Sequence, residues 1–496
     1  MTKQSTRDKF ERTSGVLLHP TSLPSKHGIG DLGEAAYGFV NVLAETKQKL
    51  WQVLPLGPTG FGDSPYQCFS TFAGNPLLIS LEKLSEAGLI PAQELNSTEH
   101  FDDSKVDYGR VINYKYALYR KAFANFVEDK EFKTFCASKK AWLNDYALFM
   151  SLKQHFNGHS WNEWENDIKL KEPAAITKYT KLLANEIAFH KFLQFHFFKQ
   201  WYELKTYANK NGVKIIGDIP IYVAFDSSDA WGTPSAFFFD KNMSPTKVAG
   251  VPPDYFSKTG QLWGNPLYNW KALKKDNYKW WLDRIVATKE LVDIIRIDHF
   301  RGFCEYWAVP YGSTTAIDGK WEKGPGADIF TAIKEMLGNL PILAEDLGLL
   351  TPDVHVLRDK FGFPSMKILE FAFNAHESSS YIPHLLEQNS VVYTGTHDND
   401  TVVGWFKKAS REDRALFMEY TNTDGKNVAW DFIRLAFASV ADIAIVPMQD
   451  ILSLDSDSRM NTPSLASGNW QWRFRWDQLT LDIKSRLKRF TQIYQR

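Results

Sequence analysis

Short apolar runs that end in polar residues or proline recur along the chain. Eight of them have the length and the Val, Ile and Leu content of strands buried in a parallel sheet. They cover residues 15–19, 50–56, 214–219, 293–298, 341–345, 366–373, 391–397 and 443–449. Apolar residues with the spacing of a helix lie between many of these runs, as at Ala36, Phe39, Val40 and Leu43. This alternation predicts an α/β fold, a (β/α)8 TIM barrel.

Two links between the predicted strands, 57–213 and 222–292, are far longer than barrel loops need to be. The first is rich in helical pattern, and its last helix has a stop signal at Asn211-Gly212. In the second, Gly, Pro and aromatic residues over 248–270 favour an ordered, exposed loop over a helix. About 45 residues follow the last strand, too few for a C-terminal β-sandwich.

We therefore expect one barrel domain over residues 1–496 with two large insertions between its strands. The first, over 84–213, is expected to be helical. The second, over 224–291, is expected to be rich in loops and to cover the active site, because barrel active sites lie where the strands end.

Charge and cysteine usage narrow the class of protein. Lys and Arg together number 58, as do Asp and Glu, so no bulk charge favours nucleic acid or an anionic membrane. Three cysteines without a CxxC spacing fit a reducing compartment. No apolar stretch approaches the roughly 18 to 20 residues of a membrane span. We expect a cytoplasmic protein with no nucleic-acid or membrane partner. Aromatic residues make up 15% of the chain, which fits either a large aromatic core or sugar binding.

Ionisable side chains gather at the ends of the predicted strands. Single carboxylates there are commonly caps, but five strands carry one: Asp218, Asp298, Glu345, Asp398 and Asp450. Because the C-terminal ends of barrel strands meet at one face, we expect these groups to face a common site.

Arg296 and Asp298 are two residues apart on one strand and point to the same side. The guanidinium would hold Asp298 ionised, as a carboxylate nucleophile requires, although a structural ion pair is the alternative. Glu345 ends the next strand, where burial near other carboxylates would raise its pKa and suit a general acid; a capping role is the alternative. Such a pair suits retaining glycosyl transfer, which needs the carboxyls about 5–5.5 Å apart.

His397 and Asp398 would contact sugar hydroxyls, and Asp398 would bind them most strongly in the distorted transition state; the alternative for each is a hydrogen bond within the loop. Other chemistries lack their motifs. The His ligands of a barrel metallohydrolase, a P-loop and a Gly-x-Ser-x-Gly elbow are missing from the sequence. The stretch GIGDLG (28–33) has the wrong spacing for a dinucleotide fingerprint, and we interpret it as a turn before a helix.

Taken together, the motifs resemble those of the amylomaltases, or disproportionating enzymes, which are 4-α-glucanotransferases of the α-amylase superfamily. The resemblance runs nearly end to end. Its segments are GVLLHPTSLPSKHGIGDLG (15–33), WQVLPLGPTGFGDSPYQCFSTFAGNP (51–76), GDIPIYV (217–223), VAGVPPDYFSKTGQLWGNPLYNW (248–270), DIIRIDHFRGF (293–303), ILAEDLG (342–348), YTGTHDNDT (393–401) and MNTPSLASGNWQWRF (460–474).

The resemblance implies a role for each candidate residue. Asp298 would be the nucleophile, Glu345 the acid/base and Asp398 the transition-state stabiliser. The implied substrate-binding residues are Tyr66, Asp218, Asp254, Phe256, Gln261, Trp263, Arg296, His299 and His397. Two positions depart from the family, with Phe61 where Tyr is frequent and Lys258 where an acidic residue is common.

The function implied is transfer of α-1,4-glucan segments from a maltooligosaccharide donor to glucose or a maltooligosaccharide acceptor. No metal or organic cofactor is expected, because carboxylates perform the chemistry. A hydrolase with the same residues and a non-catalytic glucan-binding protein are the alternatives. The segment 251–255 (VPPDY) would help to exclude water from the glucosyl-enzyme.

Overall fold

The computed structural model describes residues 10–96, 99–253, 257–348 and 350–496. All eight predicted barrel strands are present: β1 (Thr13–Leu17), β2 (Leu50–Gln52), β3 (Lys214–Ile219), β6 (Ile294–Ile297), β9 (Ile342–Ala344), β10 (Ser365–Ile368), β11 (Ser390–Tyr393) and β12 (Ile443–Pro447). They pair in the order β10-β11-β12-β1-β2-β3-β6-β9, with every pairing parallel. The Ala344 N–H donates to the Pro364 carbonyl at 3.3 Å and draws the two ends of the sheet together. The predicted (β/α)8 barrel is confirmed.

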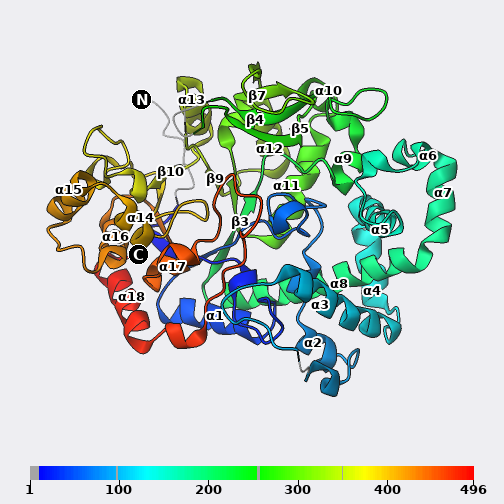
Figure 1. Cartoon of the computed structure of the whole chain (residues 1–496), viewed down its shortest axis with the longest axis horizontal. Helices are drawn as coiled ribbons and strands as arrows, with labels where there is room; N and C mark the ends of the chain where they lie inside the picture. Colours follow the sequence, from blue (N-terminus) through cyan, green and yellow to red (C-terminus); the bar gives the residue numbers. More distant parts are fainter. Residues whose placement is uncertain (1–9, 97–98, 254–256, 349) are drawn as a thin grey trace.

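Helices surround this sheet (Figure 1). They include α1 (Glu34–Glu45), α8 (Ala184–Lys210), α11 (Lys279–Leu291), α12 (Ala327–Leu337), α13 (Pro352–Phe361), α14 (Val402–Lys408), α15 (Arg411–Thr421), α16 (Val428–Ala438), α17 (Met448–Ile451) and α18 (Leu481–Ile493). Helix α1 begins directly after the GIGDLG turn and buries the four apolar residues that predicted it. The fully described link between β10 and β11 carries two short 3-10 helices in place of an α-helix.

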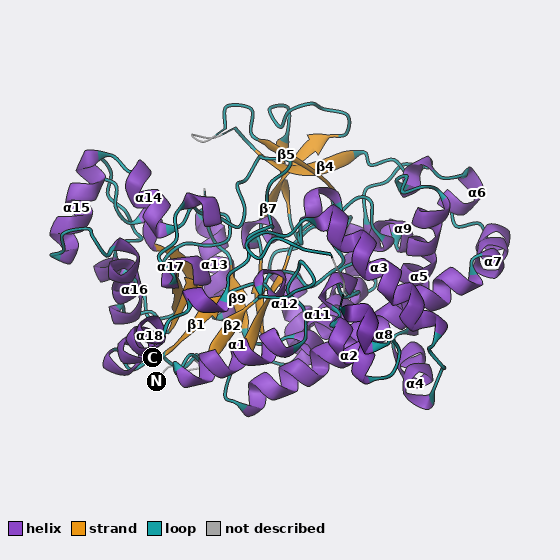
Figure 2. Cartoon of the chain, turned by 60° about the horizontal axis from the view of Figure 1, so that its bottom comes forward, coloured by secondary structure: helices purple, strands orange, loops and turns teal. Residues whose placement is uncertain are grey.

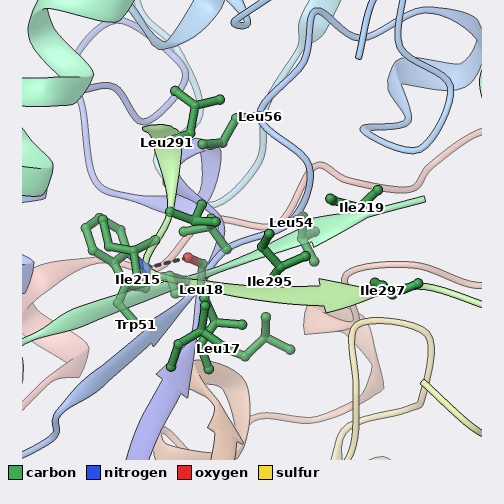
Figure 3. Packing of buried hydrophobic residues seen from close by; sticks show 14 of the residues in the cluster. Leu17, Leu18, Trp51, Leu54, Leu56, Ile215, Ile219, Leu291, Ile295 and Ile297 are labelled. Atoms are coloured by element: carbon green, nitrogen blue, oxygen red, sulfur yellow. Dashed lines mark hydrogen bonds between the residues drawn. The ribbon is translucent and has the colours of Figure 1, made fainter. Parts of the chain in front are cut away.

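Apolar side chains from neighbouring strands and their connections form the core (Figure 3). Trp51 of β2 is completely buried, and its indole N–H donates to the Leu18 carbonyl at 2.8 Å. A buried indole needs such a partner, because an unpaired N–H in the core is costly. The same bond fixes β2 against the end of β1.

Several helices precede α8 and lie together at one side of the barrel (Figure 1). They are α2 (Leu81–Glu86), α3 (Tyr108–Ala124), α4 (Lys130–Ser138), α5 (Lys140–His155), α6 (Asn166–Lys169) and α7 (Pro173–Leu182). Lys115 of α3 is fully buried and donates to the carbonyls of Leu77 and Ile79 at 2.7 and 3.0 Å, with Asp31 at 3.9 Å. The GIGDLG turn thus helps to anchor α3 on the barrel. The boundaries 84–213 remain a prediction.

A second, antiparallel sheet has the order β5-β4-β7-β8. It contains β4 (Lys247–Val251), β5 (Gln261–Pro266), β7 (Glu305–Pro310) and β8 (Lys320–Lys323), and α9 (Ser228–Gly232) and α10 (Trp270–Lys275) flank its first two strands in sequence. Figure 2 shows β4, β5 and β7 standing apart from the barrel strands. The expectation of a loop over 248–270 was therefore wrong: β4 and β5 are ordered by pairing with β7, which follows β6 and is far away in sequence.

The region 224–291 is thus only partly loop, and its predicted role as a cover stays a prediction. The β7–β8 hairpin in the link after β6 was not predicted either. Of the helices in the described ranges, none is both long and apolar enough to cross a bilayer.

Candidate active site

Arg296 is buried near the end of β6 and joins two of the predicted carboxylates. Its Nη1 donates to Asp218 of the neighbouring strand β3 and lies 3.2 Å from Oδ1 of Asp298. The β3–β6 register sets Asp218 directly opposite Arg296. The Tyr66 hydroxyl donates to the same Asp218 oxygen at 2.6 Å. The structure thus brings four predicted residues into one connected network.

Glu345 follows β9 and is attached to the residues around Asp298. Its backbone N–H donates to the Ile297 carbonyl at 3.0 Å, and its carbonyl accepts from Phe300 at 3.0 Å. Its carboxylate accepts a hydrogen bond from the backbone N–H of His299 at 2.5 Å. Asp298 and Glu345 therefore lie at adjacent strand ends on one side of the barrel, as the sequence predicts.

Burial raises the pKa of both carboxylic acids. The charge of Arg296 opposes this effect, whereas the negative charge of Asp298 raises the pKa of Glu345 further. Arg296 hydrogen-bonds Asp298 directly. We therefore assign the ionised form to Asp298 and the proton to Glu345, because two adjacent buried carboxylates cannot both ionise at low cost.

Asp398 lies in the loop after β11. Its Oδ2 is 3.4 Å from Nε2 of His397, and its Oδ1 accepts from the Asn461 side-chain amide at 2.6 Å. Desolvation alone would raise the pKa of Asp398, but the His397 charge and these hydrogen bonds outweigh it and lower the pKa to about 2. Burial would lower the pKa of His397, but Asp398 raises it instead. Each residue thus favours the charged form of the other, His397 by lowering the pKa of Asp398 and Asp398 by raising the pKa of His397.

Aromatic rings line the same end of the barrel. Tyr66 and His397 stack with their centroids 5.0 Å apart, and Trp470 lies 5.8 Å from Tyr66. On β5, the Trp263 ring meets the His299 ring edge-on at 4.9 Å, and its N–H donates to Gln261 at 3.2 Å.

Of the predicted substrate-binding residues, Tyr66, Asp218, Gln261, Trp263, Arg296, His299 and His397 all occur in these contacts. Asp254 and Phe256, like Tyr255 of the proposed cover, lie outside the described residues.

Three residues that contact this group were not predicted from the sequence: Arg459, Asn461 and Trp470. All three lie in or beside the segment 460–474, which carried the family resemblance but no assigned residue. Polar and aromatic residues in an aperiodic stretch gave no other signal.

In the described parts of the chain, no group of three or more His, Cys, Asp or Glu side chains has the arrangement of a metal site.

A parallel barrel with this many ionisable side chains at the ends of its strands has the architecture of a barrel enzyme. The family model described as 4-alpha-glucanotransferase, glycoside hydrolase family 77, matches residues 18–480. This chain therefore belongs to the 4-alpha-glucanotransferase family, and the resemblance seen in the sequence is confirmed.

Full-length relatives and a solved structure agree with this assignment. A 4-alpha-glucanotransferase of Synechocystis sp. is 49% identical, with 98% of each chain covered. One from Thermus thermophilus is 45% identical over 98% of this chain and 100% of its own. The structure of the amylomaltase from Streptococcus agalactiae in complex with acarbose matches with a TM-score of 0.96 and 42% identity, covering 98% of this chain and 100% of that one.

Proposed function

We propose that this enzyme transfers α-1,4-glucan segments between maltooligosaccharides by a retaining double displacement. The observation that carries the mechanism is the asymmetric carboxyl pair. Arg296 hydrogen-bonds Asp298, while Glu345 lies on the adjacent strand end without that guanidinium bond. One acid is set up as a nucleophile and the other as a proton donor.

In the first step, the Asp298 carboxylate attacks the anomeric carbon of the donor. Glu345 gives its proton to the glycosidic oxygen, and the reducing-end part of the glucan leaves. A glucosyl-enzyme ester on Asp298 remains. In the second step, the ionised Glu345 takes the proton of an acceptor 4-hydroxyl, whose oxygen attacks the same carbon and releases Asp298. Two inversions give net retention.

Asp398 is proposed to stabilise the positively charged, distorted sugar between these two states. His397 and Asn461 hold its carboxylate ionised and oriented. The Tyr66 ring, supported by stacking on His397, would form the platform for the sugar. Each of these groups is fixed before substrate arrives, which favours the transition state over the ground state.

Transfer requires that an acceptor sugar outcompete water for the glucosyl-enzyme. Well-oriented groups can react with effective molarities of about 10⁵ M or more, far above the roughly 55 M of water. Trp263 on β5 lies beside His299 and donates to Gln261 on the same strand, and these contacts support the proposal that the two residues orient an acceptor, glucose or a maltooligosaccharide. A hydrolase with the same catalytic residues is the alternative.

A product assay on pure maltotriose tests the proposal. Transfer gives glucose together with a ladder of longer oligomers, and the number of reducing ends stays constant. Hydrolysis gives only shorter products, with reducing ends rising in step with cleavage. A non-catalytic glucan-binding protein would give neither result, and Asp298→Ala would change none of its behaviour.

We also propose that the enzyme works in the cytoplasm. Its three cysteines, Cys68, Cys136 and Cys304, are all free thiols, which supports a reducing compartment. Fractionation of cells with a specific antibody would test this location.

A further inference from the structure

Residues 459–461, which follow β12 in sequence, contact the loop after β11 that carries Asp398. The backbone N–H of Asn461 donates to the His397 carbonyl at 3.1 Å, and its side-chain amide donates to Asp398 Oδ1 at 2.6 Å. Asp398 lies in a turn beyond the strand, and 50% of its side chain is exposed. Barrel packing alone therefore does not orient its carboxylate.

The side chain of Arg459 joins these two stretches of backbone. Its Nε donates to the Asn461 carbonyl at 2.6 Å, and its Nη2 donates to the Asp398 carbonyl. Both N–H groups belong to one planar guanidinium, so their separation is fixed. One side chain thus fixes the distance between residues 398 and 461, on which the hydrogen bond from the Asn461 amide to the Asp398 carboxylate depends.

We propose that Arg459 is a positioning residue for the transfer reaction, which holds Asp398 against Asn461 in the orientation that the transition state requires. This inference rests on the role of Asp398 proposed above. Arg459 acts through Asp398 and not on the sugar. A misplacement of about 1 Å can cost about 10²-fold in rate, so the loss of this bridge should be visible in kcat.

A purely structural role is the competing explanation, because Arg459 also faces a buried acid. Burial and the charges of Asp450 and Asp400 raise the pKa of Glu370, and the charge of Arg459 opposes them. Losing Arg459 would therefore also remove a positive charge that partly offsets the negative charges around Glu370. The two roles differ in their readout: a structural loss lowers the folded fraction, whereas a positioning loss lowers the turnover of each folded molecule.

Steady-state kinetics on maltotriose with Arg459→Met and Arg459→Lys separate the two roles. For Arg459→Met we expect kcat to fall about 10- to 100-fold with little change in KM, measured per folded molecule. A lysine offers one point donor and cannot bridge both carbonyls, so Arg459→Lys should recover only part of the loss. Arg475→Met is the matched control, since Arg475 is exposed just beyond the segment 460–474 and pairs with Asp477. Unchanged kcat in both Arg459 variants would overturn the inference.

A double-mutant cycle combines Arg459→Met with Asp398→Asn. If Arg459 acts through Asp398, its removal should cost less than about 3-fold there, because the carboxylate it positions is already gone. An undiminished cost would overturn the inference. If Asp398→Asn kept the wild-type rate, the proposed role of Asp398 would itself be wrong. If Asp398→Asn lost activity while Arg459→Met kept it, only the role of Arg459 would be wrong.

Discussion

The backbone N–H of His299 donates a hydrogen bond to the Glu345 carboxylate at 2.5 Å, although the two residues are 46 positions apart in sequence. His299 has a φ of 51°, in the left-handed region that few non-glycine residues adopt. The chain turns sharply there, directly after Asp298. The β6–β9 register, with Ile297 opposite Ala344, sets both acids at the same level of the barrel. The geometry of the proposed reaction thus follows from strand register and one unusual turn.

Asp298→Asn should lose several orders of magnitude in transfer rate while maltooligosaccharide binding survives. The amide keeps the shape and its place near Arg296 but cannot form the covalent intermediate. Initial rates on maltotriose and calorimetric titration with an oligomer measure the two properties separately. Asp293→Asn is the matched control, because Asp293 lies just before β6, at the other end of the strand, and bonds the backbone of Ile215. Comparable activity in both variants would rule out Asp298 as the nucleophile.

Glu345→Gln should be nearly inactive on maltooligosaccharides but should release an activated leaving group, such as a nitrophenol, from a suitable donor. Such a group departs without protonation, so the missing acid matters little in that step. Pre-steady-state release of the phenol and turnover on maltotriose are the two measurements. An equal loss on both donors would mean that Glu345 does not act as the acid.

The stability of the protein should also report on Glu345. Burial, and then the charge of Asp298, raise the pKa of Glu345, so the folded state holds this proton more tightly than the unfolded chain. The free energy of folding that this proton contributes is therefore complete below the pKa of an ordinary glutamate, about 4.3. It is lost as the pH rises through the higher pKa of Glu345 in the folded state. Glu345→Gln removes that loss and should raise Tm by about 1–2 °C at about pH 8, but not at about pH 4. Calorimetric scans at the two pH values measure this change in Tm, with the exposed Glu335→Gln as control. A change in Tm that did not depend on pH would contradict the raised pKa of Glu345.

The barrel could be predicted because its strands are buried on both faces and leave continuous apolar runs, as in Ile443–Pro447. The second sheet could not be predicted in the same way. Strand β5 (Gln261–Pro266) alternates between partly buried and exposed positions only as far as Gly264, and its last two residues are buried. It is ordered by β4, which in turn pairs with β7. Pairing between segments so far apart in sequence leaves no local pattern.

The residues of the candidate site also differ in whether their meeting could be predicted. Asp298 and Glu345 could be predicted to meet, because the C-terminal ends of parallel strands share one face of a barrel. Arg459 and Asn461 come from a stretch without helical or strand periodicity. Their contact with Asp398 depends on the path of the chain after β12, which only tertiary structure determines.

Tyr66→Phe separates the two contacts of Tyr66. The ring that stacks on His397 is kept, while the hydrogen bond to Asp218 at 2.6 Å is lost. A hydrogen bond to a charged group contributes about 1.5–3 kcal/mol, so kcat/KM should fall about 10- to 150-fold. Tyr66→Ala also removes the platform and should cost considerably more. Kinetics on maltotriose with the exposed Tyr311→Phe as control test this order, and equal losses in the Phe and Ala variants would refute a role for the ring.

Arg496→Met should destabilise the fold without changing turnover. The Arg496 side chain is buried and donates to the carbonyls of Ala436, Phe437 and Ser439 where helix α16 ends, at 2.9, 3.0 and 3.1 Å. Arg12 also donates to the carbonyls of Phe437 and Ser439, so the variant loses several hydrogen bonds but leaves those two acceptors partnered, and the free energy of unfolding should fall by about 2–4 kcal/mol. Arg489→Met is the matched control, because Arg489 is exposed on α18, the helix that precedes Arg496. Urea denaturation of both variants measures the difference. If the two lost equal stability, the acceptors at the end of α16 would not depend on Arg496; a drop in kcat of folded Arg496→Met would show that this contact reaches the active site.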